Sequence, residues 1–99
     1  MPSQGYYFTS ILTNRANGTL YTGVTNNLAR RIIEHRTGNG NAFTARYNLR
    51  RLVWFEPHTD IEQAILREKR IKNWNRAWKI ELVEAQNPMW HDLAVEMGL

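Results

Sequence analysis

One short predicted helix places two polar side chains on its apolar face, and both are of types that can bind or act on a phosphate. Residues 28, 31, 32 and 35 share that face because they recur at intervals of three and four, and two of them are Arg31 and His35. Burying an arginine is costly unless it is paired or reaches water, so the ordinary alternative is that both groups extend to the rim of the fold. Since they lie one turn apart, they can instead converge on one phosphate, with Arg31 supplying a fixed charge and His35 a proton donor or acceptor.

A carboxylate lies on the inward face of a later predicted helix. Glu68 follows Ala64 by four residues and Ile65 by three. Pairing with a neighbouring arginine is the ordinary role of such a group. The catalytic alternative is to hold Mg²⁺, which is often bound by one or two carboxylates together with water and phosphate oxygens.

One carboxylate, one arginine, one histidine and one tyrosine are sufficient for phosphodiester hydrolysis. The metal polarises the phosphate and binds the leaving oxygen, while the arginine stabilises charge on the phosphate. A tyrosine or the histidine takes the proton from the attacking water. A tyrosine acts as base only if a cation, here Arg31 or the metal, lowers its pKa from about 10.

Other chemistries have no matching pattern. The three histidines lack the spacing of a zinc site, and the chain has no Walker or GxGxxG loop and no nucleophile elbow around Ser3 or Ser10. The absence of cysteine excludes disulfides and thiolate metal sites. No apolar run spans a membrane and residues 1–5 do not open a signal peptide, so we expect a cytoplasmic protein with no membrane partner.

Positive charge is confined to residues 15–79. All thirteen Lys and Arg, ten of them arginine, lie there with five acids, so this segment carries +8 of a chain whose net charge is +4. The last twenty residues contain four acids and no base. A solvated basic surface and a polyanionic partner such as nucleic acid both explain this distribution, and arginine is the side chain whose planar fork grips phosphate.

The first half of the chain predicts a hairpin followed by a helix. Residues 6–12 and 19–24 favour strands, and Asn17-Gly18 between them is a strong turn signal. Residues 25–27 offer caps for a helix that runs to about Arg36, with Gly38 as its stop. The state of residues 43–47 is left open.

The second half predicts one strand and three helices. Residues 52–55 favour a strand that ends before Pro57. The capping-box spacing of Thr59 and Glu62 opens a helix to about residue 73, with Ile61, Ala64, Ile65 and Ile71 on its apolar face. Asn75 caps a helix that ends at residues 87–88, and a short last helix begins at Pro88.

The expected fold class is α/β (α+β), with a small three-stranded, mostly antiparallel sheet packed with helices in the order β-β-α-β-α-α. Ninety-nine residues allow one domain, which we place at 1–99 with a core of about 6–80 and a helical tail at 81–99. The four tryptophans are assigned to the packing of the fold in preference to stacking on bases.

These residues together resemble the GIY-YIG nuclease superfamily. Residues 20–28, followed by Arg31 and His35, resemble the second half of its domain, and residues 21–23 (Tyr-Thr-Gly) match its YIG tripeptide. Glu68 matches the metal-binding glutamate on a later helix. The resemblance covers the chain from about Tyr6 to Leu93 and is to small stand-alone bacterial members.

The resemblance implies Mg²⁺- or Mn²⁺-dependent cleavage of DNA, with one divalent ion and no nucleotide cofactor, in DNA repair or processing. Arg31 would contact the scissile phosphate and Glu68 would hold the metal, while Tyr21 and His35 would position or activate water. Basic side chains near these residues would bind DNA: Arg30, Arg36, Arg46, Arg50, Arg51, Lys69 and Lys72.

The chain departs from the family at its first motif. The family places a tyrosine about eleven residues before the YIG tyrosine, and here that position is Ser10. Tyr7 lies fourteen residues before Tyr21, so it can serve only if a bulge or a different strand register brings it into the site. The family's late asparagine has two possible equivalents, Asn73 and Asn75.

Three functions are therefore compared. The first is a metal-dependent DNA endonuclease, which the ordered set of Tyr21, Arg31, His35 and Glu68 favours. The second is a DNA-binding module with weak or lost catalysis, which Ser10 favours. The third is a protein-interaction domain that uses the acidic C-terminal segment. The sequence does not define the oligomeric state.

Overall fold

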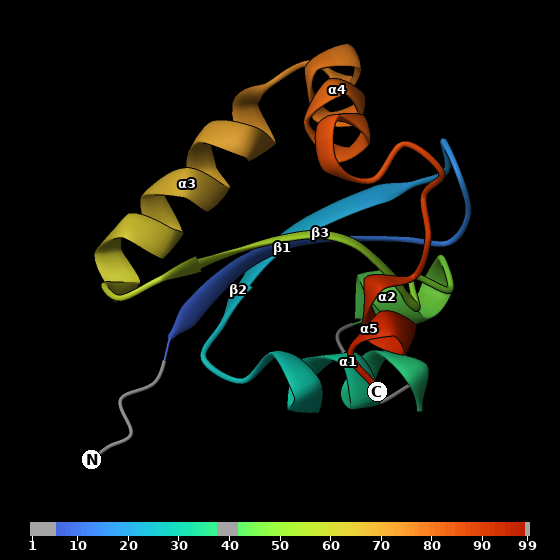
Figure 1. Cartoon of the computed structure of the whole chain (residues 1–99), viewed down its shortest axis with the longest axis horizontal. Helices are drawn as coiled ribbons and strands as arrows, with labels where there is room; N and C mark the ends of the chain where they lie inside the picture. Colours follow the sequence, from blue (N-terminus) through green and yellow to red (C-terminus); the bar gives the residue numbers. More distant parts are fainter. Residues whose placement is uncertain (1–5, 38–41, 99) are drawn as a thin grey trace.

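Three strands form an antiparallel sheet at the centre of the molecule. The computed structural model describes residues 6–37 and 42–98. Strands β1 (Tyr7–Thr13), β2 (Leu20–Thr25) and β3 (Arg51–His58) are ordered β2-β1-β3, with β1 antiparallel to both neighbours (Figure 1). The expected hairpin and the three-stranded antiparallel sheet are confirmed.

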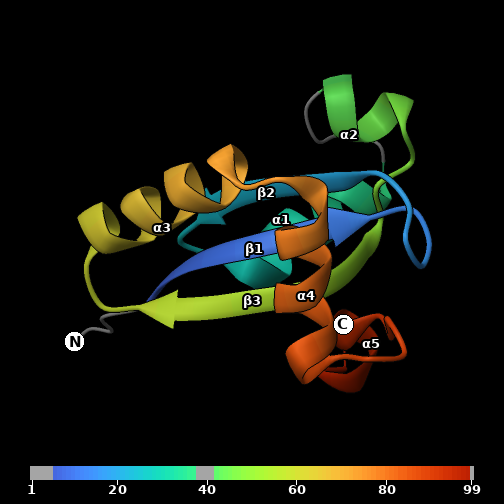
Figure 2. The ribbon, with the colours of Figure 1, turned by 90° about the horizontal axis from the view of Figure 1, so that it is seen from above.

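Helices cover both faces of this sheet. Helices α3 (Ile61–Asn73) and α4 (Arg76–Gln86) lie on one face, and α1 (Leu28–Arg36), α2 (Ala42–Arg46) and α5 (Leu93–Glu96) lie on the other (Figures 1 and 2). Each face has its own apolar cluster. One contains Ile11, Val53, Trp54, Ile71, Val83 and Trp90, and the other contains Leu12, Leu28, Ile32, Leu49, Leu52 and Ala94.

Strand β1 divides its side chains between these two layers, because successive residues of a strand point to opposite faces. Thr9 faces α3, since its hydroxyl donates a hydrogen bond to the Ala64 carbonyl at 2.9 Å. Leu12 belongs to the cluster that contains Leu28 of α1. Ser10 therefore faces α1, on the side of the sheet opposite to Thr9.

Most helix boundaries follow the predicted caps. Asn27 caps α1 by accepting from Arg30 N, and Asn75 caps α4 by accepting from Trp78 N. The predicted cap of α3 was wrong: Asp60, not Thr59, accepts from Glu62 N at 2.9 Å. Aspartate is a strong N-cap and stands directly before the first helical residue. The expected stop at Gly38 lies outside the described residues.

Three further boundaries differ from the prediction. Strand β3 continues through Pro57 to His58, because β3 is an edge strand and an edge residue needs no N–H on its outer side. The last helix begins at Leu93 behind the cap Asp92, not at Pro88. Most of the segment 43–47, for which the sequence predicts no state, is helical, because α2 spans Ala42–Arg46.

Exposure also corrects two of the packing assignments. Ile61 and Ile65 were expected on the buried face of α3, yet 38% and 37% of their surfaces are exposed, and the buried residues of α3 are Ala64 and Ile71. Trp54 and Trp90 are buried as expected, whereas Trp78 is 55% exposed.

The acidic C-terminal segment is tied back onto the sheet. Asn87 Nδ2 donates to the Val53 carbonyl at 3.0 Å, and Trp90 Nε1 donates to a carboxylate oxygen of Glu84 at 2.7 Å. Helix α4 crosses the expected boundary between core and tail near residue 80. Among the described residues, no helix is long and apolar enough to cross a membrane.

Candidate active site

Gly23 makes room for two of the predicted side chains at strand β2. It pairs with Ser10 of β1, while Tyr21 pairs with Leu12, so all four residues face the α1 side of the sheet. A Cβ atom at Gly23 would lie 3.3 Å from Cε2 of Tyr21 and 3.8 Å from Nη2 of Arg31. The Arg31 guanidinium therefore reaches back from α1 over Gly23, beside the tyrosine ring.

His35 contacts the same tyrosine. The two rings meet edge to face, with centroids 6.4 Å apart and planes inclined at 62°. His35 is buried, and its Nδ1 shares a 2.8 Å hydrogen bond with Oγ1 of Thr44. Its Nε2 is buried without a hydrogen-bond partner among the described residues.

The surroundings of His35 favour the neutral imidazole. Burial lowers the pKa of His35 below its usual value of 6.5, and the neighbouring charge of Arg31 lowers it further, against a smaller opposing effect of Glu34. Near neutral pH the ring is therefore uncharged, so one of its two nitrogens carries a lone pair that can accept a proton or a hydrogen bond.

Glu68 approaches this group from the opposite layer. Helix α3 packs against both β1 and β2, and β2 is an edge strand. Glu68 Oε2 lies 3.3 Å from Nζ of Lys72, and that ammonium lies 6.0 Å from the centroid of the Tyr21 ring. Tyr21 thus lies close to Arg31 and His35 of α1 and also to Lys72 of α3, at the β2 edge of the sheet.

The donor set at Glu68 suits a hard divalent cation. The Glu68 side chain is 20% exposed, and among the described residues no group of three or more His, Cys, Asp and Glu gathers around a common point. A single accessible carboxylate is the kind of ligand that Mg²⁺ takes when water and phosphate oxygens complete its coordination. It does not suit zinc, which needs three or four protein ligands.

The first-motif position holds Ser10, and Tyr7 does not replace it. Ser10 is 5% exposed and lies between Gly23 of β2 and Phe55 of β3. Tyr7 pairs with His58, an odd number of residues away from Ser10, so it faces the α3 side. The bulge in β1 falls between Ile11 and Leu12, beyond the stretch that joins Tyr7 to Ser10. The sheet therefore separates Tyr7 from the residues on α1.

The residues expected to bind DNA divide into two groups. Arg36 pairs with Asp92 at 2.7 Å and Arg51 donates to the Trp90 carbonyl at 3.0 Å, so both hold the C-terminal segment. The others are exposed, namely Arg30, Arg46, Arg50, Lys69 and Lys72. The structure thus leaves five of the seven on the surface, where a phosphate can reach them.

Two contacts of the site were not anticipated from the sequence. Thr44, in a segment whose structure was left open, orients the imidazole of His35. Lys72 was expected to bind DNA, whereas it contacts both Glu68 and Tyr21. The contact between Lys72 and Glu68 had a signal in the sequence, because the two residues are four apart on a predicted helix.

Comparison with known proteins identifies the family to which the chain belongs. Residues 6–81 match the model of the GIY-YIG catalytic domain. A UPF0213 protein of Desulfotalea psychrophila is 46% identical over 74 residues, which cover 71% of this chain and 64% of that protein. A UPF0213 protein of Lactiplantibacillus plantarum is 38% identical over 85 residues, covering 83% of this chain and 81% of the relative.

A solved structure shares the architecture. The solution NMR structure of a UPF0213 protein from Bacillus halodurans superposes with a TM-score of 0.56 at 28% identity, covering 89% of this chain and 93% of that one. The fold is therefore shared with a UPF0213 protein, and the family model covers the strands and helices that hold Tyr21, Arg31, His35 and Glu68. The chain belongs to the GIY-YIG family and is similar to its small UPF0213 members.

Proposed function

We propose that this protein is a metal-dependent endonuclease that hydrolyses phosphodiester bonds of DNA, in repair or processing. The observation that carries the proposal is the convergence on Tyr21. Arg31 and His35 reach this residue from α1, and Lys72, paired with Glu68, reaches it from α3.

In this proposal each side chain acts through the contact that it makes. Arg31 binds the scissile phosphate and stabilises the charge that builds on its oxygens. His35 is neutral and aligned by Thr44, and Nε2 is the nitrogen that would accept a proton in the tautomer whose Nδ1 donates to Thr44. Tyr21, which lies beside Arg31, His35 and Lys72, holds the water in place.

Glu68 is the residue that would hold Mg²⁺ or Mn²⁺. When bound, such an ion supplies Lewis-acid stabilisation of the phosphate and the leaving oxygen. Lys72 competes with the cation for Glu68, because its ammonium already pairs with that carboxylate. The exposed basic residues Arg30, Arg46, Arg50 and Lys69 would bind flanking phosphates.

Cleavage of plasmid and branched DNA in the presence of Mg²⁺ or Mn²⁺ tests the proposal. Arg31→Ala and Glu68→Ala are expected to reduce the rate by about 100-fold or more, as the loss of a charge-stabilising group does. Arg15→Ala and Glu62→Ala are matched controls, because both residues are exposed and lie outside the site. If wild type cuts no DNA, or if both site variants cut as fast as wild type, the proposal is wrong.

A second candidate is a DNA-binding module whose catalysis is weak. Ser10 favours it, because this buried hydroxyl occupies the position next to Gly23 at which the family carries a tyrosine, and Tyr7 lies on the opposite face. Under this alternative, binding is salt-sensitive and metal-dependent cleavage is slow or absent.

Substitution of Ser10 separates the two candidates. In Ser10→Tyr, the new phenol can extend over Gly23 towards Arg31. If Ser10 limits the chemistry, the cleavage rate rises by about 10-fold or more, within the range of general-base catalysis. Ser10→Phe is the control, since it adds a ring of similar size without the hydroxyl. Equal rates for wild type and Ser10→Tyr count against the limiting role.

A further inference from the structure

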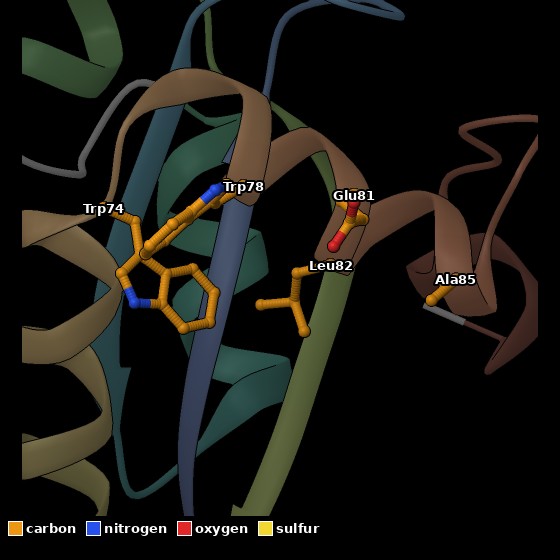
Figure 3. A pocket seen from close by; sticks show the side chains of 5 residues that line it. All are labelled: Trp74, Trp78, Glu81, Leu82 and Ala85. Carbon is orange, nitrogen blue, oxygen red and sulfur yellow. The ribbon is translucent and has the colours of Figure 1, made fainter.

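A cavity opens where α3 ends and α4 begins. It has a volume of about 350 Å³ and is lined by Trp74, Trp78, Glu81, Leu82 and Ala85. Figure 3 shows the two indole rings beside one another, with Leu82 and Glu81 on the next turn of α4. Its volume lies at the lower end of the range of ligand pockets, which is roughly 300–1,000 Å³.

The two indoles form a corner that suits a flat ring. Their centroids lie 6.0 Å apart and their planes are inclined at 78°. A planar ligand that stacks on one indole therefore meets the edge of the other, and both arrangements are favourable between aromatic rings. Aliphatic side chains gain nothing from this perpendicular geometry beyond simple burial.

One wall of the corner is fixed and the other is open. The guanidinium of Arg67 lies 5.5 Å from the centroid of Trp74 and 5.6 Å from that of the buried Trp54, and its Nε lies 3.2 Å from Glu56 Oε1. Trp74 is thereby held against the fold. Trp78 is 55% exposed, so its indole offers an accessible surface that the packing of the core does not use.

The charges around the cavity are arranged for a nucleotide. Arg70 lies in the last turn of α3, before Trp74 in the sequence, and Lys79 lies in the first turn of α4, directly after Trp78. Inside the cavity the single charged group is Glu81. Cations outside suit a phosphate backbone, whereas a carboxylate inside accepts hydrogen bonds from the amino group of a base.

We propose that this cavity binds an unpaired base of the DNA substrate. The base stacks in the corner of Trp74 and Trp78, and Glu81 accepts a hydrogen bond from its exocyclic amino group. The inference rests on the proposed function and narrows it to DNA that contains an unpaired nucleotide. Trp74 follows Lys72 by two residues, so the cavity adjoins the part of α3 that contacts Tyr21.

Other occupants fit the cavity less well. An apolar side chain that fills the cavity would cover the Glu81 carboxylate without supplying a donor, and an unpaired buried carboxylate is costly. A base with an amino group supplies that donor and a flat ring together.

Binding of labelled duplexes that differ at one bulged position tests the inference. The duplexes carry cytosine, thymine or an abasic site there, and EDTA prevents cleavage, so that affinity is measured apart from catalysis. Wild type is expected to bind the cytosine bulge about 5- to 100-fold more tightly than the abasic bulge, the range that stacking of one base provides. It is also expected to prefer cytosine to thymine, which lacks the amino group.

Four variants assign the effect to the cavity. Trp78→Ala is expected to remove the preference for a base over the abasic site, and Trp78→Phe to retain most of it. Glu81→Gln is expected to reduce the preference for cytosine over thymine. Tyr6→Ala is the matched control, because Tyr6 is 54% exposed and lies outside the cavity. Comparison of two duplexes within each variant cancels any change in the fraction of folded protein.

Three results would overturn the inference. They are equal binding of base and abasic bulges by wild type, a preference that persists in Trp78→Ala, and a dimer in solution that Trp78→Ala dissociates. If wild type cleaves DNA but shows no preference for a base, the inference fails and the proposed function stands. If it binds no DNA, both fail.

Discussion

His35 shows at the scale of one residue how the fold prepares a proton acceptor. Its neighbours are the ring of Tyr21, the hydroxyl of Thr44 and the charge of Arg31, and its pKa is lowered by burial first and by Arg31 second. The convergence of Arg31 and His35 could be predicted, because both follow from the period of one helix. The contact with Thr44 could not, since it depends on how α2 packs against α1.

The lowered pKa of His35 makes stability depend on pH. The unfolded state takes up a proton near pH 6.5, whereas the folded state resists it to lower pH. The contribution of neutral His35 is therefore fully present above pH 6.5 and declines as the pH falls from there towards the pKa of the folded state. Unfolding in urea between pH 5 and 8 measures this decline.

Two variants distinguish the effect of His35 on this pH dependence from the effects of other titrating groups. His35→Gln is expected to flatten the decline in this window, and His91→Gln to leave it unchanged, because His91 is exposed. A His35→Gln protein with the same pH dependence as wild type would contradict the assignment.

Helices α1 and α3 are the elements that must cooperate in the site, although they lie on opposite faces of the sheet (Figure 1). The caps and helical periods of both could be predicted because they are local. Their meeting at Tyr21 could not, since it depends on β2 being an edge strand and on α3 packing over it. The strand end at Pro57 was wrong for a related reason: whether a strand tolerates proline depends on its place in the sheet.

Lys72 is expected to tune the metal requirement from α3. In Lys72→Met, Glu68 loses the competing ammonium at 3.3 Å. The concentration of Mg²⁺ that gives half-maximal cleavage is expected to fall, by a factor of up to about 5, because a half-exposed pair is worth roughly 1 kcal/mol or less. Cleavage at saturating Mg²⁺ falls as well, since Tyr21 loses a neighbouring cation.

A titration of cleavage rate against Mg²⁺ gives both quantities. Lys69→Met is the control, because Lys69 is exposed on the same helix and contacts neither Glu68 nor Tyr21 in any ion pair or ring contact found among the described residues. An unchanged half-maximal concentration in Lys72→Met would show that the pair does not oppose metal binding.

Over the whole molecule, the basic residues include two groups, those that are exposed to solvent and those that hold the C-terminal segment. In the sequence, the basic segment and the acidic C-terminal tail are separate, so they are expected to form separate surfaces. In the structure Asp92 pairs with Arg36, and Arg51 donates to the Trp90 carbonyl, so part of the positive charge fastens the tail to the sheet. The tail is thereby engaged inside the fold, which argues against an acidic segment held free for another protein.

This division predicts that two arginine substitutions affect different properties, DNA binding in one case and stability in the other. Arg50→Ala, at an exposed position, is expected to weaken DNA binding and to lower the slope of log affinity against log salt by about 1. Arg36→Ala is expected to leave that slope unchanged and to lower the midpoint of thermal unfolding. Fluorescence anisotropy at several salt concentrations and a thermal melt distinguish the two, and equal slopes for both variants would refute the division.

The position of the site at the β2 edge also limits how this fold can grow. A fourth strand paired with β2 would lie across the path by which α3 reaches Tyr21, so it would close the site. A strand added beside β3 meets no such conflict. Insertions and fusions that enlarge the sheet are thus compatible with the proposed site on one side alone, which gives protein engineers a rule for attaching new domains.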